Sequence, residues 1–382
     1  MTDLFTNPHR YGDLDAWRRE AVELHAGGPI HRIEEPGYKP FWAVIGHDAV
    51  MDVERRPDEF TNAPMPVLAS EEQMARMAAG GGGAGGGAIR TLIHMDEPDH
   101  AKYRKLTSDW FKPASVKSLM PRLDGLSRAA VARLDELGGE ADFYKDIALS
   151  YPLQVILSIL GLPEADYPKM IQLTQELFGA EDPDLQRAEL TPEEMMQVVM
   201  DFYQYFADLT ADRQANPTDD LATLIANGTI DDAPMPDLEK MGYYVIIATA
   251  GHDTTAAAMA GGLRALAENP DQLKILQADL DLLPNAVDEM IRYTAPVRHF
   301  MRTAQADTEV AGVKIAKGDW LYLSYLAGNM DPAVFADPLQ FDVTRPNADK
   351  HIAFGYGIHF CLGAQLARVE LRSLFSHLVP RL

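Results

Sequence analysis

The sequence predicts a predominantly helical α+β fold, and three observations support that prediction. Apolar side chains recur at helical spacing through most of residues 121–294. Short segments with strand composition gather in the last third, at residues 308–310, 313–315 and 320–323. A chain of 382 residues, 47% apolar and 24% charged, can bury a large core. That size suits one large domain or two closely packed lobes.

The N-terminal part combines short helices with a strand. We predict helices at residues 14–25 and 47–54 and a strand at 41–45. Residues 63–90 contain two prolines and a glycine tract, so we expect a mobile loop there. The tract is not followed by the Lys-Ser/Thr pair of a phosphate-binding loop.

Asp96 and Pro98 are typical of a helix start. The helix that follows carries His100 and Arg104, which are four residues apart and therefore share one face. This face is either a solvated surface or a pair of ligand donors.

Further helices are predicted at residues 123–137, 152–160, 167–178, 192–215 and 219–226, and a long apolar helix at 238–267. The middle of the long helix holds Gly251, Asp253, Thr254 and Thr255. Threonine hydroxyls compete for backbone carbonyls and glycine weakens a helix, so we expect a local widening that admits water. There Thr254 can hold a water while Asp253 passes protons from solvent. The alternative is a satisfied buried polar cluster, and His252 is assigned no role.

Cys361 is the one cysteine of the chain and stands where a glycine-rich turn becomes a helix. A helix N-terminus lowers the pKa of a thiol, so we expect the thiolate there. A lone cysteine is most often a small buried apolar residue, but the surrounding glycines and aromatic residues argue otherwise. A zinc site is not indicated, because the sequence has no second cysteine and no nearby pair of histidines at ligand spacing. A catalytic cysteine nucleophile would also need a base and an oxyanion site, and neither is visible in the sequence. A lone thiolate beside open space suits the fifth ligand of a haem iron.

Composition excludes some classes of partner. The formal net charge is −23, which argues against nucleic acid and anionic membrane surfaces as partners. No apolar run reaches the length of a membrane span, and no signal-peptide pattern opens the chain. A single cysteine suits a reducing compartment, so we expect a cytoplasmic location.

Three motifs resemble those of the cytochrome P450 superfamily. The turn Phe354-Gly355-x-Gly357-x-His359-x-Cys361-x-Gly363 resembles its haem-binding loop at every motif position. The run Ala250-Gly251-His252-Asp253-Thr254-Thr255 resembles its oxygen-activating helix. Glu289-x-x-Arg292, with the later Arg345, is similar to its Glu-x-x-Arg network.

The resemblance implies a P450 fold, a triangular helical prism with small β-sheets, as a single domain over residues 1–382. It implies haem b with the Cys361 thiolate as axial ligand, cradled by Phe354, Gly355 and Gly363, and Asp253 and Thr254 as the catalytic proton relay. Glu289, Arg292 and Arg345 would be structural. The implied donors to the haem propionates are His100, Arg104, Arg302 and His359, with Arg298 a weaker competitor of Arg302.

The resemblance also implies a function. The chain looks like a soluble bacterial monooxygenase, most similar to the alpha-terpineol (monoterpene) hydroxylase branch and next to steroid hydroxylases. The resemblance favours a terpenoid or alkyl-aromatic substrate over a steroid. The implied pocket walls are Ile247, Ala250, Val297, Phe300 and parts of residues 63–90, with Phe178 as a further roof residue. A peroxide-driven peroxygenase and a haem-binding protein without turnover are the alternatives.

Electrons would come from a separate protein, because the chain has no flavin or nicotinamide fingerprint. The implied donor is an iron-sulfur ferredoxin with its reductase, docking on Lys102, Lys105, Lys112 and Arg368. In the resembled family a β region follows the helix after the cysteine loop, and here the sequence given ends at Leu382. Either the sequence given is truncated there, or this member lacks that wall of the pocket.

Overall fold

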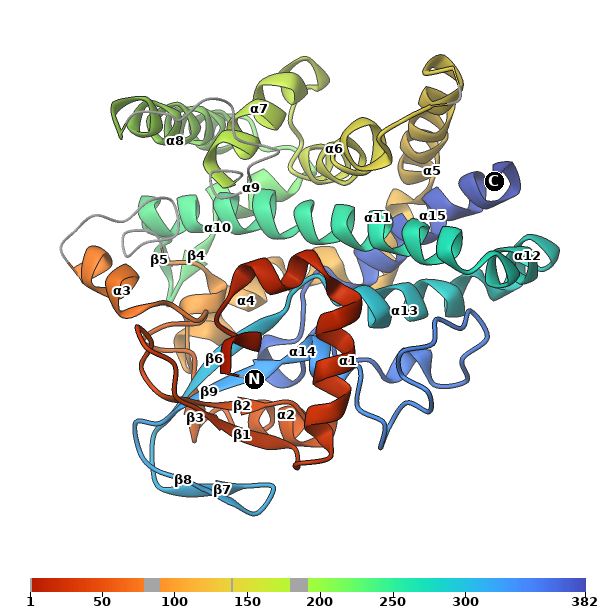
Figure 1. Ribbon diagram of the computed structural model, residues 1–382. Helices are drawn as coiled ribbons and strands as arrows, with labels where there is room; N and C mark the ends of the chain where they lie inside the picture. Colours follow the sequence, from red (N-terminus) through yellow and green to blue (C-terminus); the bar gives the residue numbers. More distant parts are fainter. Residues whose placement is uncertain (1, 79–89, 139, 179–191) are drawn as a thin grey trace.

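The computed structural model describes residues 2–78, 90–138, 140–178 and 192–382, and it places layers of helices above a small sheet (Figure 1). The helices that position the site are α2 (His47–Glu54), α4 (Asp99–Ser108), α6 (Ser150–Ile159), α10 (Asp237–Ala250), α11 (Asp253–Glu268), α13 (Leu283–Thr294) and α15 (Ala364–Leu378). The others are α1 (Leu14–His25), α3 (Glu71–Ala78), α5 (Pro113–Glu136), α7 (Tyr167–Phe178), α8 (Pro192–Ala215), α9 (Leu221–Ala226), α12 (Pro270–Ala278) and α14 (Tyr325–Gly328).

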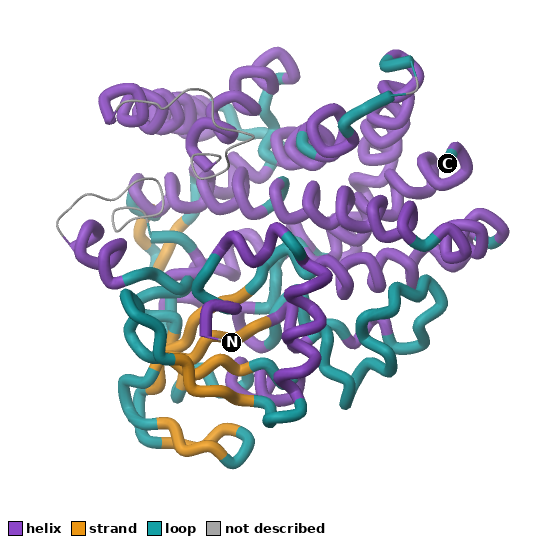
Figure 2. Tube along the Cα trace, viewed as in Figure 1, coloured by secondary structure: helices purple, strands orange, loops and turns teal. Residues whose placement is uncertain are grey.

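The strands form one mixed sheet and two hairpins, grouped on one side of the molecule (Figure 2). The five-stranded sheet has the order β1 (Ile30–Ile33), β2 (Phe41–Val44), β9 (Trp320–Ser324), β6 (His299–Ala304), β3 (Phe60–Thr61). Only the β2–β9 pair is parallel, and β9 is buried at every position, as expected for its unbroken apolar run. The hairpins pair β4 (Thr229–Ile230) with β5 (Ala233–Pro234), and β7 (Thr308–Val310) with β8 (Val313–Ile315).

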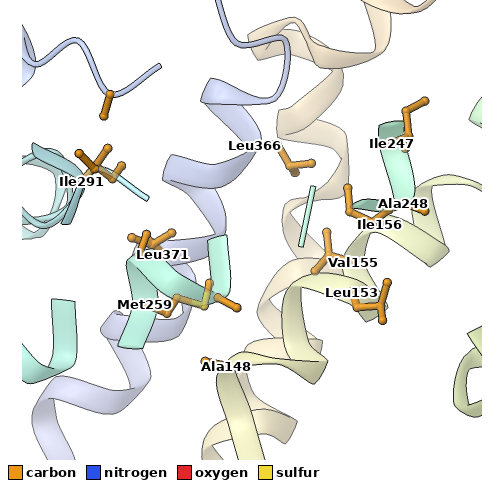
Figure 3. Close-up of a cluster of buried hydrophobic side chains, with 14 of the residues drawn as sticks. Ala148, Leu153, Val155, Ile156, Ile247, Ala248, Met259, Ile291, Leu366 and Leu371 are labelled. Carbon is orange, nitrogen blue, oxygen red and sulfur yellow. The ribbon is translucent and has the colours of Figure 1, made fainter. Parts of the chain in front are cut away.

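Helices α10 and α11 follow one another in a line across the middle of the molecule (Figure 1). The main apolar cluster surrounds them and includes Ile156 of α6, Ile247 of α10 and Leu366 of α15, which also line one cavity (Figure 3). Glycine lets α11 approach α13 closely, because a Cβ on Gly262 would lie 2.9 Å from the sulfur of Met290. The central helices thus form both the core and one wall of the site.

The prediction of one helix over residues 238–267 was wrong in one respect, because the helix is interrupted at Gly251 and His252. Side chains supply the hydrogen bonds that the interrupted backbone lacks: Thr254 and Thr255 donate to the carbonyl oxygens of Ala250 and Gly251 at 3.0 and 3.2 Å. Any Cβ at position 251 would lie 2.5 Å from Ile156. The weak point predicted from the same residues is therefore where the helix breaks.

Other boundaries also differ from the sequence predictions. Residues 71–78, predicted to belong to a loop, form α3, whereas the glycine tract lies outside the described residues. Helix α5 starts at Pro113 instead of residue 123, because Pro113 is a favourable first helical residue and Pro121 is accommodated inside the helix. The strands β1 and β3 were not predicted, since four and two residues are too few for a clear alternation.

Glu289, Arg292 and Arg345 form a buried ion network that holds the segment leading to the cysteine loop. Arg292 donates to Glu289 from Nε and Nη2 at 2.7 and 2.9 Å, and Arg345 Nε lies 3.1 Å from Glu289 Oε2. Both guanidinium groups also donate to backbone carbonyls, among them that of Gln340. The network thereby joins α13 to residues 329–345.

No helix in the described ranges is both long and apolar enough to cross a membrane.

Candidate active site

A cavity of about 1440 Å³, counting the space open to solvent, lies between α4, α10, α11, β6 and the cysteine loop. All four predicted wall residues line it: Ile247, Ala250, Val297 and Phe300. The described part of residues 63–90 does not, and Leu92 and Ile93 line it instead; the side chain of Phe178 lies outside the described residues. The walls are mostly aliphatic and aromatic, so burial of apolar surface would drive binding there.

The loop of residues 354–363 brings Cys361 to the cavity. It is closed by a hydrogen bond from the Cys361 N–H to the Phe354 carbonyl oxygen at 2.8 Å. Gly355 and Gly357 have φ angles of +68° and +66°, which favour glycine, and a Cβ on Gly357 would meet the Glu54 carbonyl oxygen at 2.1 Å. These two glycines therefore serve the turn. Phe354, Gly355 and Gly363, the three residues predicted to cradle the cofactor, line the cavity, and a Cβ on Gly363 would meet no atom within 4 Å.

The expectation of a lowered thiol pKa was wrong for the free thiol. Burial raises the pKa of Cys361, although the N–H groups of Gly363 and Ala364 and the guanidinium of Arg104 act in the opposite direction. The helix N-terminus is present as predicted, but its effect is smaller than the cost of burying a charge. A bound metal cation would supply the missing stabilisation of the thiolate.

Three nitrogen-bearing side chains gather beside Cys361 in the cavity wall. His100 and His359 have ring centroids 4.1 Å apart, and Arg104 donates from Nη2 to the Phe360 carbonyl oxygen at 2.6 Å. Nε2 of His100 and Nε2 of His359 are buried and have no hydrogen-bond partner within the described chain, whereas Nδ1 of His100 lies 3.5 Å from Oε1 of Glu97. Burial, with neighbouring Arg104, lowers the pKa of His100, and burial, with neighbouring His100, lowers that of His359 to about 2. Two neutral imidazoles with open N–H positions therefore face the cavity.

Arg302 differs from the other predicted propionate donors, because it does not line the cavity. Its Nη2 donates to Glu54 Oε1 at 3.0 Å, and Tyr325 donates to the same oxygen at 2.7 Å. Burial raises the pKa of Glu54, and Arg302 opposes that shift. Glu54 comes from α2, more than 240 residues away, so the sequence offered no signal for this pair. Arg298 is occupied by the carbonyl oxygens of Thr294 and Ala295.

Two consecutive side chains just after the helix interruption have different surroundings. Thr254 lines the cavity, and because its hydroxyl donates to Ala250, its oxygen remains free to accept a hydrogen bond. Asp253 does not line the cavity, and its side chain is 47% exposed. Asp253 is therefore in contact with solvent, and the next residue, Thr254, is in contact with the cavity.

Sequence reasoning missed a second carboxyl group, that of Glu370 on α15. It is 1% exposed, lines the cavity, and its Oε2 has no hydrogen-bond partner within the described chain. Burial raises the pKa of Glu370 well above its usual value, because a charged carboxylate is disfavoured away from water. The apolar spacing of α15 gave one signal, since Glu370 falls on the same face as Leu366.

The four basic residues predicted for docking are not equivalent. Arg368 is half-buried, donates to Asp288 at 2.6 Å and lies over the ring of Phe354, so it supports the cysteine loop. Lys102 and Lys112 form ion pairs with Asp231 and Asp109. Lys105 is exposed.

The residues around the cavity fit an iron porphyrin. One thiol on a glycine-rich turn can serve as an axial ligand, and the open side of Gly363 leaves room for a flat group. The open donors of His100 and His359 and the guanidinium of Arg104 suit the two carboxylates of such a group. The aliphatic walls suit its hydrocarbon face.

Comparison with known proteins agrees with this fit. Residues 67–382 match the family model described as Cytochrome P450. The chain is 42% identical to Cytochrome P450-terp of a Pseudomonas species over 98% of this chain and 89% of that protein. It is 32% identical to linalool 8-monooxygenase of Pseudomonas putida over 99% of this chain and 90% of that protein.

A solved structure shows the same fold. The crystal structure of CYP108D1 from Novosphingobium aromaticivorans superposes with a TM-score of 0.88 at 42% identity, covering 99% of this chain and 90% of that one. The motifs, the cavity and these matches lead to one assignment. The chain belongs to the cytochrome P450 family of haem-thiolate monooxygenases.

Proposed function

We propose that the protein hydroxylates a small or mid-sized apolar molecule, and that this substrate is a terpenoid or an alkyl-aromatic compound rather than a steroid. The reaction uses O₂ and two electrons from a separate ferredoxin. The observation that carries the proposal is the thiol of Cys361 in a mostly apolar cavity that Thr254 also lines. The relatives support the substrate class, because one is named for a terpene and another for linalool.

Haem, when bound through Cys361, supplies dioxygen activation and C–H oxidation. The chain's own residues have separate tasks. His100, Arg104 and His359 bind the carboxylates of the group, and Ile247, Val297 and Phe300 hold an apolar substrate by burial. Arg302 pairs with Glu54 and does not line the cavity, so we assign it no direct contact with the group.

Thr254 and Asp253 move protons. Thr254 accepts a hydrogen bond from a water at the cavity wall, since its own proton is engaged by Ala250. Asp253 takes protons from solvent through its exposed carboxylate. Together they deliver protons to the cavity without opening it to bulk water.

Two measurements test the proposal. The reduced protein with carbon monoxide should show a thiolate-type Soret band that Cys361→Ser abolishes; a band typical of neutral histidine ligation in the unchanged protein would contradict it. Spectral-shift titration with alpha-terpineol, linalool, alkyl-benzenes and sterones then ranks the substrates. Steroid binding that is tighter than terpene binding would overturn the substrate class.

The same preparation separates the alternatives. Product formation with ferredoxin, reductase and NADH is expected to exceed product formation with hydrogen peroxide alone. Equal rates would favour a peroxygenase, and a thiolate spectrum without any product would favour a haem-binding protein without turnover.

A further inference from the structure

His252 is a buried imidazole placed directly beside the proposed proton relay. It occupies the interruption between α10 and α11, and 2% of its side chain is exposed. Asp253 and Thr254 follow it directly in sequence, so the three residues lie within one helical turn at the start of α11. A histidine this deeply buried requires partners for its ring nitrogens.

Both ring nitrogens of His252 face oxygen atoms. Nδ1 lies 2.8 Å from the carbonyl oxygen of Ala248. That oxygen would accept the His252 backbone N–H in a regular helix, but the N–H is directed to Thr249 at 3.4 Å instead. Nε2 lies 2.9 Å from Asp253 Oδ1. The ring therefore replaces a lost backbone hydrogen bond on one side and contacts the relay carboxylate on the other.

These contacts bear on where protons can lie. A backbone carbonyl only accepts, so Nδ1 donates to Ala248. Nε2 lies 2.9 Å from Asp253 Oδ1, and a proton held by either group would make this contact attractive.

We propose that His252 is a positioning residue that holds Asp253 at the helix interruption and shares with it the proton that the relay delivers. The pair gives one proton to the water at Thr254, and the exposed side of Asp253 takes one proton from solvent. The charge of the pair is then unchanged over a cycle. This inference rests on the proposed function and adds a residue to its relay.

The test compares two substitutions at position 252. His252→Gln keeps an amide that can hydrogen-bond but cannot carry the shared proton, and His252→Phe keeps only the volume. Thr249→Val is the matched control, because Thr249 also donates to a backbone carbonyl of α10, at 2.8 Å, yet lies outside the cavity wall. The assay uses holoprotein, alpha-terpineol, and a bacterial ferredoxin with its reductase and NADH.

Both His252 variants are expected to release more hydrogen peroxide per NADH and to form product about tenfold more slowly, a fraction of the 10²–10⁴-fold that positioned proton donors contribute. Their solvent isotope effect should rise, while turnover driven by added hydrogen peroxide, which brings its own protons, stays within twofold of the unchanged protein. Thr249→Val should leave the coupling intact. If His252→Phe lowers only the melting temperature and leaves coupling and isotope effect unchanged, the proposal is overturned.

A second readout does not depend on turnover. Thermal unfolding of His252→Phe, Asp253→Ala and the double variant should be non-additive, because each single change removes the same contact. Additive shifts in melting temperature would show that the two side chains do not interact and would overturn the proposal. A wild-type protein without the thiolate spectrum would overturn the proposed function instead, and this cycle would still decide whether the pair exists.

Discussion

Two buried polar clusters of this protein differ in whether their hydrogen-bonding groups have partners. In the network of Glu289, Arg292 and Arg345, the carboxylate receives both guanidinium groups and these also reach backbone carbonyls. At the cavity, by contrast, His100, His359 and Glu370 each keep a buried polar atom without a partner in the described chain. The first cluster holds residues 329–345, and the second lines the cavity with Cys361.

The difference separates structural residues from ligand-binding residues. A buried ion network is tolerated when its members satisfy one another, and removing one member then leaves an uncompensated charge. Buried groups without partners cost stability, so their presence around a cavity indicates that a ligand completes them. Substitutions in the first cluster should therefore lower stability, whereas substitutions in the second should weaken ligand binding.

Breaking the satisfied network should have the largest effect. Glu289→Gln leaves two buried guanidinium groups without a carboxylate, so we expect a loss of about 3–5 kcal/mol in the free energy of unfolding. Chemical denaturation of the holoprotein measures it. Glu268→Gln breaks the exposed pair with Arg264 and should cost less than about 1 kcal/mol. Similar losses in both variants would contradict the structural assignment.

Removing a hydrogen-bond donor that has no partner should instead weaken binding of the cofactor. His100→Phe keeps a ring of similar size and removes two buried nitrogens, so the haem-free protein should lose no stability. Haem binding should weaken by about 10- to 150-fold, as expected for a lost hydrogen bond to a charged group of about 1.5–3 kcal/mol. Haem transfer to apomyoglobin measures the affinity. A large drop in apoprotein stability with unchanged haem transfer would place His100 with the structural cluster.

Glu370 should make stability depend on pH. Its folded pKa is raised by burial, so the unfolded state releases the proton first, and stability falls as pH rises above about 4.5, the usual value of the group. Glu370→Gln removes this dependence. Its stability relative to the unchanged protein should rise between pH 5 and pH 8 by at least about 1.4 kcal/mol, the equivalent of one pKa unit. Parallel unfolding curves at both pH values would mean that Glu370 is ionised in the folded protein.

The smallest effect concerns docking. Lys105 is exposed near the cysteine side, whereas Arg368 is engaged by Asp288. Lys105→Gln should therefore raise the KM for an acidic ferredoxin by about two- to threefold at low salt and less at high salt, because exposed charges mainly steer association. Ferredoxin titrations at two ionic strengths provide the measurement, and a salt-independent change would argue against electrostatic docking.

Much of this protein was predictable from local sequence. Helices α1, α2, α7 and α8 occur at the predicted residues, because a 3.6-residue apolar period and capping residues are local properties. The cysteine turn, the weak point at residues 250–255 and the carboxylate–guanidinium motif were equally local. Their spacing identified the family before any contact was known.

Other features depended on residues far apart in the chain. Glu54 reaches Arg302 across 248 positions, and Leu92 and Ile93 replace the predicted loop as cavity wall. The burial of His252, and the lack of a hydrogen-bond partner for the Glu370 carboxyl group, could not be predicted locally, since both depend on which helices pack against these residues. The raised thiol pKa of Cys361 has the same origin: the helix start is local, but desolvation is a property of the assembled fold.

For Cys361 and its neighbours, the amino-acid sequence by itself determined the fold family and predicted the axial ligand and the residue types of the relay, because each follows from a motif of a few consecutive residues. Only the tertiary structure decided which donors remain open for a ligand, which are already paired, and how Asp253 is held, because hydrogen-bond satisfaction requires the partner to be in place.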